Sequence, residues 1–226
     1  MILAIHAATE KITIALIKNG SKLDGYLVEG ETKQTEKLVA WIETLLSKNN
    51  IKPADLKAIG ICKGPGAFTG LRLAMVTAKT FAMTLNIPLY GFTLFEGLAR
   101  ELLFANLKEN VMATFYACRG QVNNALINLK GDWPKIEMQL AVDEKEFFSN
   151  LPNVDGFVGD LPQGFPKKII HCPVTALGIG LLTEAAYLNR IPSQLNELQL
   201  LYSHEPNIKW SNKPELAMLR QQRPQN

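Results

Sequence analysis

The chain has 226 residues, of which 47% are hydrophobic and 20% charged, and its formal net charge is +3. This composition excludes a disordered chain, no apolar run is long enough to predict a membrane span, and the small positive excess does not indicate a dedicated nucleic-acid binder. Cys62, Cys118 and Cys172 lie far apart without a C-x-x-C pair, so the sequence predicts neither a disulfide framework nor a zinc site and favours a reducing cytoplasm.

The first thirty residues predict an antiparallel meander of three strands. The apolar runs at 2–5 and 12–17 are too continuous for strands with one wet face, so we expect them inside a sheet that is covered on both faces. Asn19-Gly20 predicts a hairpin turn because both residues tolerate positive φ, and a third strand is expected over 23–28.

Residues 31–48 form the clearest predicted helix. Leu38, Trp41, Ile42 and Leu45 fall at i, i+3, i+4 and i+7, which gives the helix one apolar stripe. One interpretation is core packing onto the sheet. The other is a protein interface, because tryptophan and other aromatic anchors are concentrated there.

Residues 57–85 predict a strand, a loop containing Gly64-Pro65-Gly66, and a helix that begins at Thr69 as its N-cap. Phosphate-binding loops use this order. The sequence nevertheless contains neither a P-loop nor a dinucleotide fingerprint, because no Lys-Ser or Lys-Thr pair follows Gly70 and the glycines are spaced too widely. The alternative is a tight turn that lets the helix pack closely on the strand. The residues expected to contact a phosphate or a partner are Gly64, Gly66, Thr69, Gly70 and Arg72.

After a strand over 87–92, Thr93 and Glu96 form a capping box for a third helix. The second half then repeats the opening, with three strands expected over 111–140, weaker strands near 155–158 and 168–172, and a helix over 175–189. Two halves of one topology suggest an internal duplication. We expect a first subdomain at 1–104, a second at 105–192, and a final segment at 193–226 with a strand over 198–202 and an irregular tail.

The nine residues Gly64 to Arg72, GPGAFTGLR, resemble the Gly-Pro-Gly-[Ser/Ala]-Phe-Thr-Gly-Leu-Arg motif of the TsaB (YeaZ) family. The segment at 88–99, PLYGFTLFEGLA, is also similar, and weaker likenesses extend over nearly the whole chain. The resemblance implies an α/β fold of the actin-like and sugar-kinase ATPase type, with two related mixed-sheet subdomains and a degenerate nucleotide site. It also implies a non-catalytic scaffold role in forming threonylcarbamoyladenosine on tRNA.

The resemblance further implies partners. A TsaD-like transferase would pair with the helices at 35–48 and 69–85, a TsaE-like ATPase would join, and the isolated chain would form a homodimer. No cofactor is required by this chain, ADP or ATP is expected only at the partner interface, and tRNA is reached only through the complex. The expected interface residues are Leu38, Trp41, Ile42, Leu45, Leu71, Met75 and Phe81.

This sequence departs from the family at two positions, where relatives carry carboxylates and it has His6 and Tyr116. A neutral imidazole is a poor ligand for magnesium, which prefers hard oxygen donors. One alternative, an ATPase or kinase of the actin-like fold, would have to use Glu10 and Asp160.

The other alternative, a metallopeptidase-like protein, would need ligands from His6, His171 and His204, which are scattered without an H-E-x-x-H motif. Cys118 and Cys62 have no histidine nearby in the sequence, and a pairing in space stays open.

Overall fold

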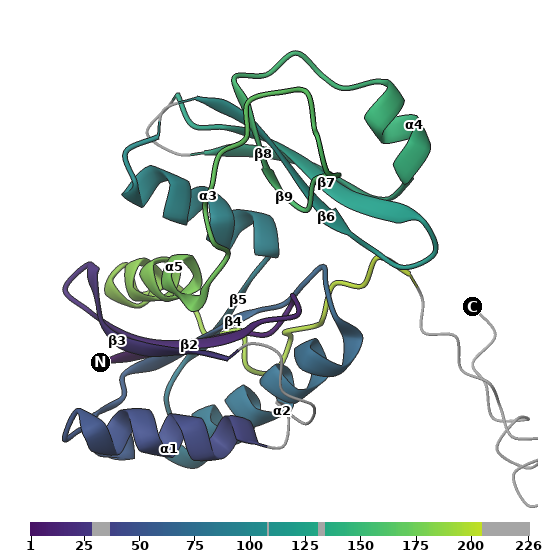
Figure 1. Cartoon of the computed structure of the whole chain (residues 1–226). Helices are drawn as coiled ribbons and strands as arrows, with labels where there is room; N and C mark the ends of the chain where they lie inside the picture. Colours follow the sequence, from purple (N-terminus) through teal and green to yellow (C-terminus); the bar gives the residue numbers. More distant parts are fainter. Residues whose placement is uncertain (29–36, 108, 131–133, 205–226) are drawn as a thin grey trace, which may run out of the picture.

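The computed structural model describes residues 1–28, 37–107, 109–130 and 134–204 (Figure 1). The start of the helix predicted over 31–48 and the tail after residue 204 therefore lie outside the described residues. The described part contains two mixed β-sheets, each accompanied by helices.

The first sheet is built around β1, which pairs antiparallel with β2 and parallel with β4. Its strand order is β3-β2-β1-β4-β5. Every residue of β1 is buried, and Asn19 (φ 54°) and Gly20 (φ 73°) form the expected turn after β2, so the predicted meander is confirmed. The strands are β1 (Ile2–His6), β2 (Ile12–Lys18), β3 (Ser21–Val28), β4 (Ala58–Cys62) and β5 (Leu89–Phe92).

The second sheet repeats the arrangement of the first four strands in its order β8-β7-β6-β9. Its central strand β6 again pairs antiparallel with the strand that follows it and parallel with a later one, β9. The predicted repetition of topology is thus confirmed. The strands are β6 (Asn110–Tyr116), β7 (Gln121–Asn128), β8 (Lys135–Asp143) and β9 (Gly156–Gly159).

The helices form three layers around the two sheets (Figure 1). Two helices, α1 and α2, cover the outer face of the first sheet, α3 and α5 lie between the sheets, and α4 lies on the far side of the second sheet. Their bounds are α1 (Leu38–Lys48), α2 (Phe68–Leu85), α3 (Leu94–Phe104), α4 (Glu144–Ser149) and α5 (Ala176–Leu188), and a short 3-10 turn, η2 (Pro53–Asp55), precedes β4.

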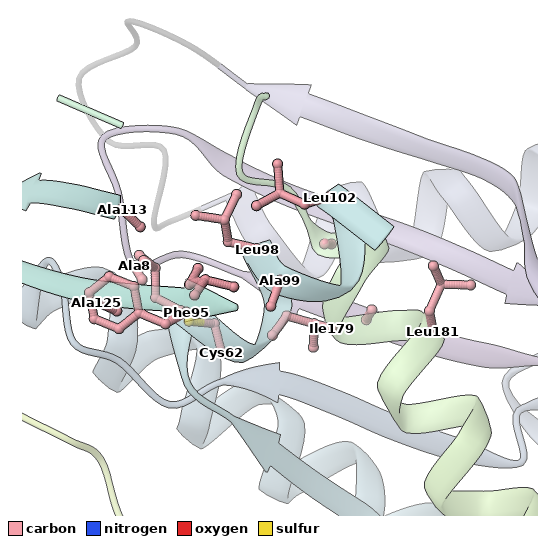
Figure 2. Close-up of a cluster of buried hydrophobic side chains, with 14 of the residues drawn as sticks. Ala8, Cys62, Phe95, Leu98, Ala99, Leu102, Ala113, Ala125, Ile179 and Leu181 are labelled. Atoms are coloured by element: carbon pink, nitrogen blue, oxygen red, sulfur yellow. The ribbon is translucent and has the colours of Figure 1, made fainter. Parts of the chain in front are cut away.

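The core has one part on each face of the first sheet. Leu3 and Ile5 of β1 pack on the α1 and α2 side together with Ile42. Between the sheets, Phe95 and Leu98 of α3 belong to one buried cluster with Ile179 of α5, which lies beside Ala99 in Figure 2. Since alternate residues of β1 point to opposite faces, the sheet is covered on both sides, as its continuous apolar runs predict. A third, smaller cluster lies under α4 and contains Phe147 and Phe157.

The two central helices, α3 and α5, are joined by a buried carboxylate. Glu101 of α3 accepts hydrogen bonds from the N–H and hydroxyl of Thr175 and from the N–H of Gly178, at 2.9–3.1 Å. These donors stand at the N-terminus of α5, where a helix has unsatisfied N–H groups and favours negative charge. Burial nevertheless raises the pKa of Glu101 to about 7, although these hydrogen bonds act in the opposite direction.

The helix termini are partly as predicted. Thr93 accepts from the N–H of Glu96, and the Glu96 carboxylate accepts from the N–H of Thr93, so the expected capping box of α3 is confirmed. Thr69 is not the N-cap of α2, which begins at Phe68 after Ala67 and has no side-chain cap. The N–H of Ala67 instead donates to the carbonyl of Ala8 at 2.7 Å, so a backbone contact fixes the start of this helix.

Two strands predicted near the end of the chain do not form. Over 168–172 only an isolated bridge joins Ile169 to Phe157, and 198–202 is irregular backbone. The segment 193–204, which we call the strap, crosses the edge of the first sheet instead of extending it. The side-chain oxygen of Gln194 accepts a hydrogen bond from the N–H of Gly91 in the edge strand β5, and the N–H of Leu201 donates to the carbonyl of Lys63.

Candidate functional site

The loop before α2 is pressed against the backbone that follows β1. A Cβ added at Gly66 would meet the carbonyl of Ala8, and one added at Gly70 would meet that of Ala7. Gly64 has φ 112°, a region that favours glycine, and the strap lies against it through Leu201. The glycines therefore let a strand, a helix and the strap approach closely, which is the second interpretation of the motif. Phosphate binding by Gly64, Gly66 and Gly70 stays a prediction.

A cleft of ≈ 1690 Å³ lies beside this loop and is lined by residues of both halves. Thr9 and Glu10 line it from the loop after β1, and Asp160 lines it from the end of β9. The Asp160 carboxylate accepts from the N–H of Tyr116 at 3.0 Å. Burial raises the pKa of Asp160, and the nearby charge of Glu10 raises it further. The two carboxylates named from the sequence thus face one cleft.

His6 lies beside this cleft rather than in it. Its side chain is fully buried at the end of β1, opposite Thr13 of β2, which does line the cleft. The imidazole makes no hydrogen bond to another described residue, and burial lowers the pKa of His6 to about 4. His6 is therefore neutral at physiological pH.

Arg72 is held at the cleft rim by two aromatic residues. Its guanidinium lies 3.9 Å from the centre of the Phe68 ring, and its Nε donates to the hydroxyl of Tyr202 at 3.3 Å. The rings of Phe68 and Tyr202 are 5.2 Å apart. The sequence suggested Arg72, but it did not indicate Tyr202, because the strap brings this residue across 130 positions of the chain. Thr69 is exposed in the same first turn of α2.

Most residues expected at a partner interface face the protein's own core. Leu38, Ile42, Leu45 and Leu71 have no exposed surface and Met75 is 8% exposed, whereas Trp41 and Phe81 are half-buried. The five buried residues pack on the first sheet in the folded chain and are not available to a partner, whereas Trp41 and Phe81 stay predicted interface residues. The core interpretation of the Trp41 stripe therefore holds for its three aliphatic residues.

The exposed face of these two helices has other apolar side chains. On α2, Val76 is 64% and Met83 is 68% exposed, and on α1, Val39 is 53% exposed. Val76 and Met83 are seven positions apart, so they lie on one side of α2. That spacing is the signal by which the sequence could have revealed them.

The three histidines do not come together. His6 is buried at the end of β1, His171 is exposed at the cleft, and His204 contacts Cys118 on the rim. Among the described residues, no group of three or more His, Cys, Asp or Glu side chains is placed to hold a metal ion.

Comparison with known proteins places the chain in a family. A family model described as "TsaD: tRNA N6-adenosine threonylcarbamoyltransferase" matches residues 30–220. The tRNA threonylcarbamoyladenosine biosynthesis protein TsaB of Bacillus subtilis is 30% identical, over 74% of this chain and 82% of that protein. This chain belongs to the TsaB family. The TsaB of Escherichia coli is 26% identical, and the match covers 54% of this chain and 52% of that protein.

Solved structures show the fold of this TsaB-family chain. YeaZ from Pseudomonas aeruginosa superposes with a TM-score of 0.73 at 20% identity, covering 89% of this chain and 98% of YeaZ. A second Pseudomonas aeruginosa structure, titled as similar to peptidase YEAZ, gives a TM-score of 0.74 at 18% identity, covering 90% and 99%. The predicted actin-like α/β fold with two related mixed sheets is confirmed. Within the described residues no helix is long and apolar enough to cross a membrane.

Proposed function

We propose that this chain is a non-catalytic subunit in the formation of threonylcarbamoyladenosine on tRNA and that it pairs with a TsaD-like transferase. The proposal rests on membership of the TsaB family, which is named for this biosynthesis. It includes pairing through the outer face of α1 and α2, and a homodimer through the same face when the partner is absent.

One observation carries the choice of surface, namely the apolar side chains exposed on α2. Val76 and Met83 are each about two-thirds exposed, and Arg72 and Lys79 are the only charged residues of the helix. A helix that faces only water usually carries charged residues on its outer side. Exposed apolar side chains with few charges are the composition found in the centre of protein interfaces. Val39 extends this surface onto α1.

The test is co-elution of this chain with a purified TsaD-like protein in size-exclusion chromatography. We expect a complex with the wild type and none with Val76→Glu or Met83→Glu, because each change would bury an unpaired carboxylate in the contact. Leu188→Glu is the matched control, since Leu188 is 70% exposed but lies on α5. Complex formation by both α2 variants, or its equal loss in the control, would refute this surface.

The non-catalytic role has its own assay. Transfer of threonylcarbamoyl to tRNA would be measured with the TsaD-like protein alone, with this chain alone and with both. We expect no transfer by this chain alone and stimulation when both are present. Transfer by this chain alone would overturn the proposal.

Further partners belong to the same proposal. A TsaE-like ATPase joins the pair, and ADP or ATP binds at the partner interface and not to this chain by itself. The net charge of only +3 supports contact with tRNA through the complex alone. Labelled tRNA should therefore shift with the complex and not with the isolated chain.

A second candidate function, nucleotide binding within this chain, is favoured by one observation. Glu10 and Asp160 face the same cleft from opposite halves, and paired carboxylates can hold Mg²⁺ with a nucleotide. Calorimetry with Mg-ATP would distinguish the two candidates. Binding by the isolated wild type that is lost in Asp160→Asn would favour the second, and absence of heat in the wild type would remove it.

A further inference from the structure

Cys118, Gln121 and His204 meet at the mouth of the cleft, although 86 positions separate Cys118 from His204. Cys118 is exposed in the turn between β6 and β7, and Gln121 is the first residue of β7. The strap carries His204 to this turn from the first sheet. The histidine that Cys118 lacks in the sequence is thus supplied by tertiary structure.

Hydrogen bonds fix which nitrogen of His204 carries the proton. The side-chain amide nitrogen of Gln121 donates to the carbonyl of Ala141 at 2.9 Å, so its amide oxygen is the atom that faces His204 Nε2. An amide oxygen can only accept, and Nε2 must therefore carry the hydrogen. Nδ1 faces the Cys118 sulfur at 3.5 Å, and in the neutral ring it is the nitrogen that can accept a proton.

A bulge in β8 holds this arrangement. Ala141 has φ 55° and lies where the pairing of β7 with β8 changes register. Its N–H donates to Asn123 and its carbonyl accepts from Gln121, so both polar groups of one bulged residue bond side chains of β7. Bulges can re-aim side chains in this manner.

Within the described residues, neither of the other two cysteines has a histidine as a hydrogen-bond partner. Cys62 is fully buried, and burial raises its pKa to about 12. Cys172 also lines the cleft, but among the described residues its sulfur hydrogen-bonds only to the carbonyl of Pro173, and burial raises its pKa to about 11. The chain therefore contains one exposed thiol beside an imidazole and one cleft thiol without it.

We propose that Cys118 is a thiol-modification site at the cleft mouth, with His204 as its base and low-molecular-weight disulfides as its reagent class. His204 Nδ1 takes the thiol proton, and the Cys118 sulfur attacks one sulfur of the disulfide. The bond between the two reagent sulfurs breaks as a new one forms to Cys118. The departing thiolate takes the proton back from His204. Cys118 is oxidised to a mixed disulfide, and half of the reagent is reduced to a thiol.

The reaction of Cys118 does not depend on the proposed function. A group attached to Cys118 would lie between the β6–β7 turn and the strap, and would replace the contact between sulfur and imidazole. Modification would thereby remove one of the two contacts that His204 makes with the second half and leave its hydrogen bond to Gln121.

The experiment follows the reaction of the full chain with oxidised glutathione by intact-protein and peptide mass spectrometry. We expect one fast adduct, located on Cys118, which is absent in Cys118→Ser and retained in Cys172→Ser. His204→Ala should slow this adduct by about tenfold or more, because the base is removed. His171→Ala is the matched control, since it removes another cleft imidazole and should leave the rate unchanged.

The outcomes separate cleanly. A fast adduct on Cys172, or a His204→Ala variant that reacts at the wild-type rate, would overturn the proposal. Equal slowing by His171→Ala would also overturn it, because a general change in the cleft would then explain the effect. Circular dichroism of each variant shows that the compared proteins are folded.

Discussion

Two buried titratable groups should give this protein opposite and nearly cancelling responses to pH. His6 has a pKa of about 4 in the folded chain against 6.5 in an unfolded one, and Glu101 has about 7 against 4.5. Both shifts arise chiefly from burial, which disfavours the charged form of each group. The substitutions His6→Gln and Glu101→Gln each replace one of these titratable groups with a neutral side chain. The glutamine at 101 keeps an acceptor oxygen for the α5 N-terminus.

The sign of each contribution follows from which state binds protons more tightly. The unfolded state binds the His6 proton more tightly. Neutral His6 therefore contributes its whole share of the unfolding free energy above pH 6.5, and this share is lost as the pH falls toward 4. The folded state binds the Glu101 proton more tightly. Protonated Glu101 therefore contributes its whole share of the unfolding free energy below pH 4.5, and this share is lost as the pH rises toward 7. Between pH 4.5 and 6.5 each amounts to a change of about 2 kcal/mol, in opposite directions.

The assay is urea unfolding of the wild type and both variants across this pH range. Relative to the wild type, His6→Gln should lose about 2 kcal/mol of unfolding free energy as the pH rises, because only Glu101 still titrates. Glu101→Gln should gain about 2 kcal/mol over the same range. The unfolding free energy of the double variant should change with pH as that of the wild type does. If the unfolding free energies of both single variants also follow the pH dependence of the wild type, burial does not shift the two pKa values as stated.

Three further predictions concern packing and capping. Leu45→Ala should lower the unfolding free energy by about 2–5 kcal/mol because Leu45 is fully buried. Val39→Ala on the same helix should change it by less than about 0.5 kcal/mol because Val39 is exposed. Equal effects of the two changes in urea unfolding would contradict the assignment of core and surface. Thr93→Ala should cost about 1 kcal/mol through loss of the α3 cap, and Thr80→Ala on the exposed side of α2 should not, as thermal melts would show. Gly178→Ala should lower the unfolding free energy by about 1–3 kcal/mol, since the added Cβ would meet the carbonyl of Gly97. An unchanged melting temperature would show that α3 and α5 can move apart to admit the Cβ without loss of stability.

The sequence by itself determined the local structure of much of the chain. Asn19-Gly20 specified a turn because both residues accept positive φ, and Thr93 with Glu96 specified a helix start because their side chains satisfy N–H groups within four residues. The repeated meander and the motif from Gly64 to Arg72 indicated the fold and the family. These signals act over short stretches or through hydrophobic periodicity, so one sequence contains them.

Only the tertiary structure decided which surfaces and side chains meet. The stripe of Leu38, Ile42 and Leu45 is equally apolar whether it faces a sheet or a partner, and its burial shows that it faces the sheet. Residues 198–202 of the strap were expected to form a strand, but they are irregular backbone, and the chain continues past the sheet edge at Gln194 to the second half. This path places Tyr202 on Arg72 and His204 on Cys118. Contacts between residues so far apart depend on how the two halves pack, and a pattern local in sequence cannot specify that.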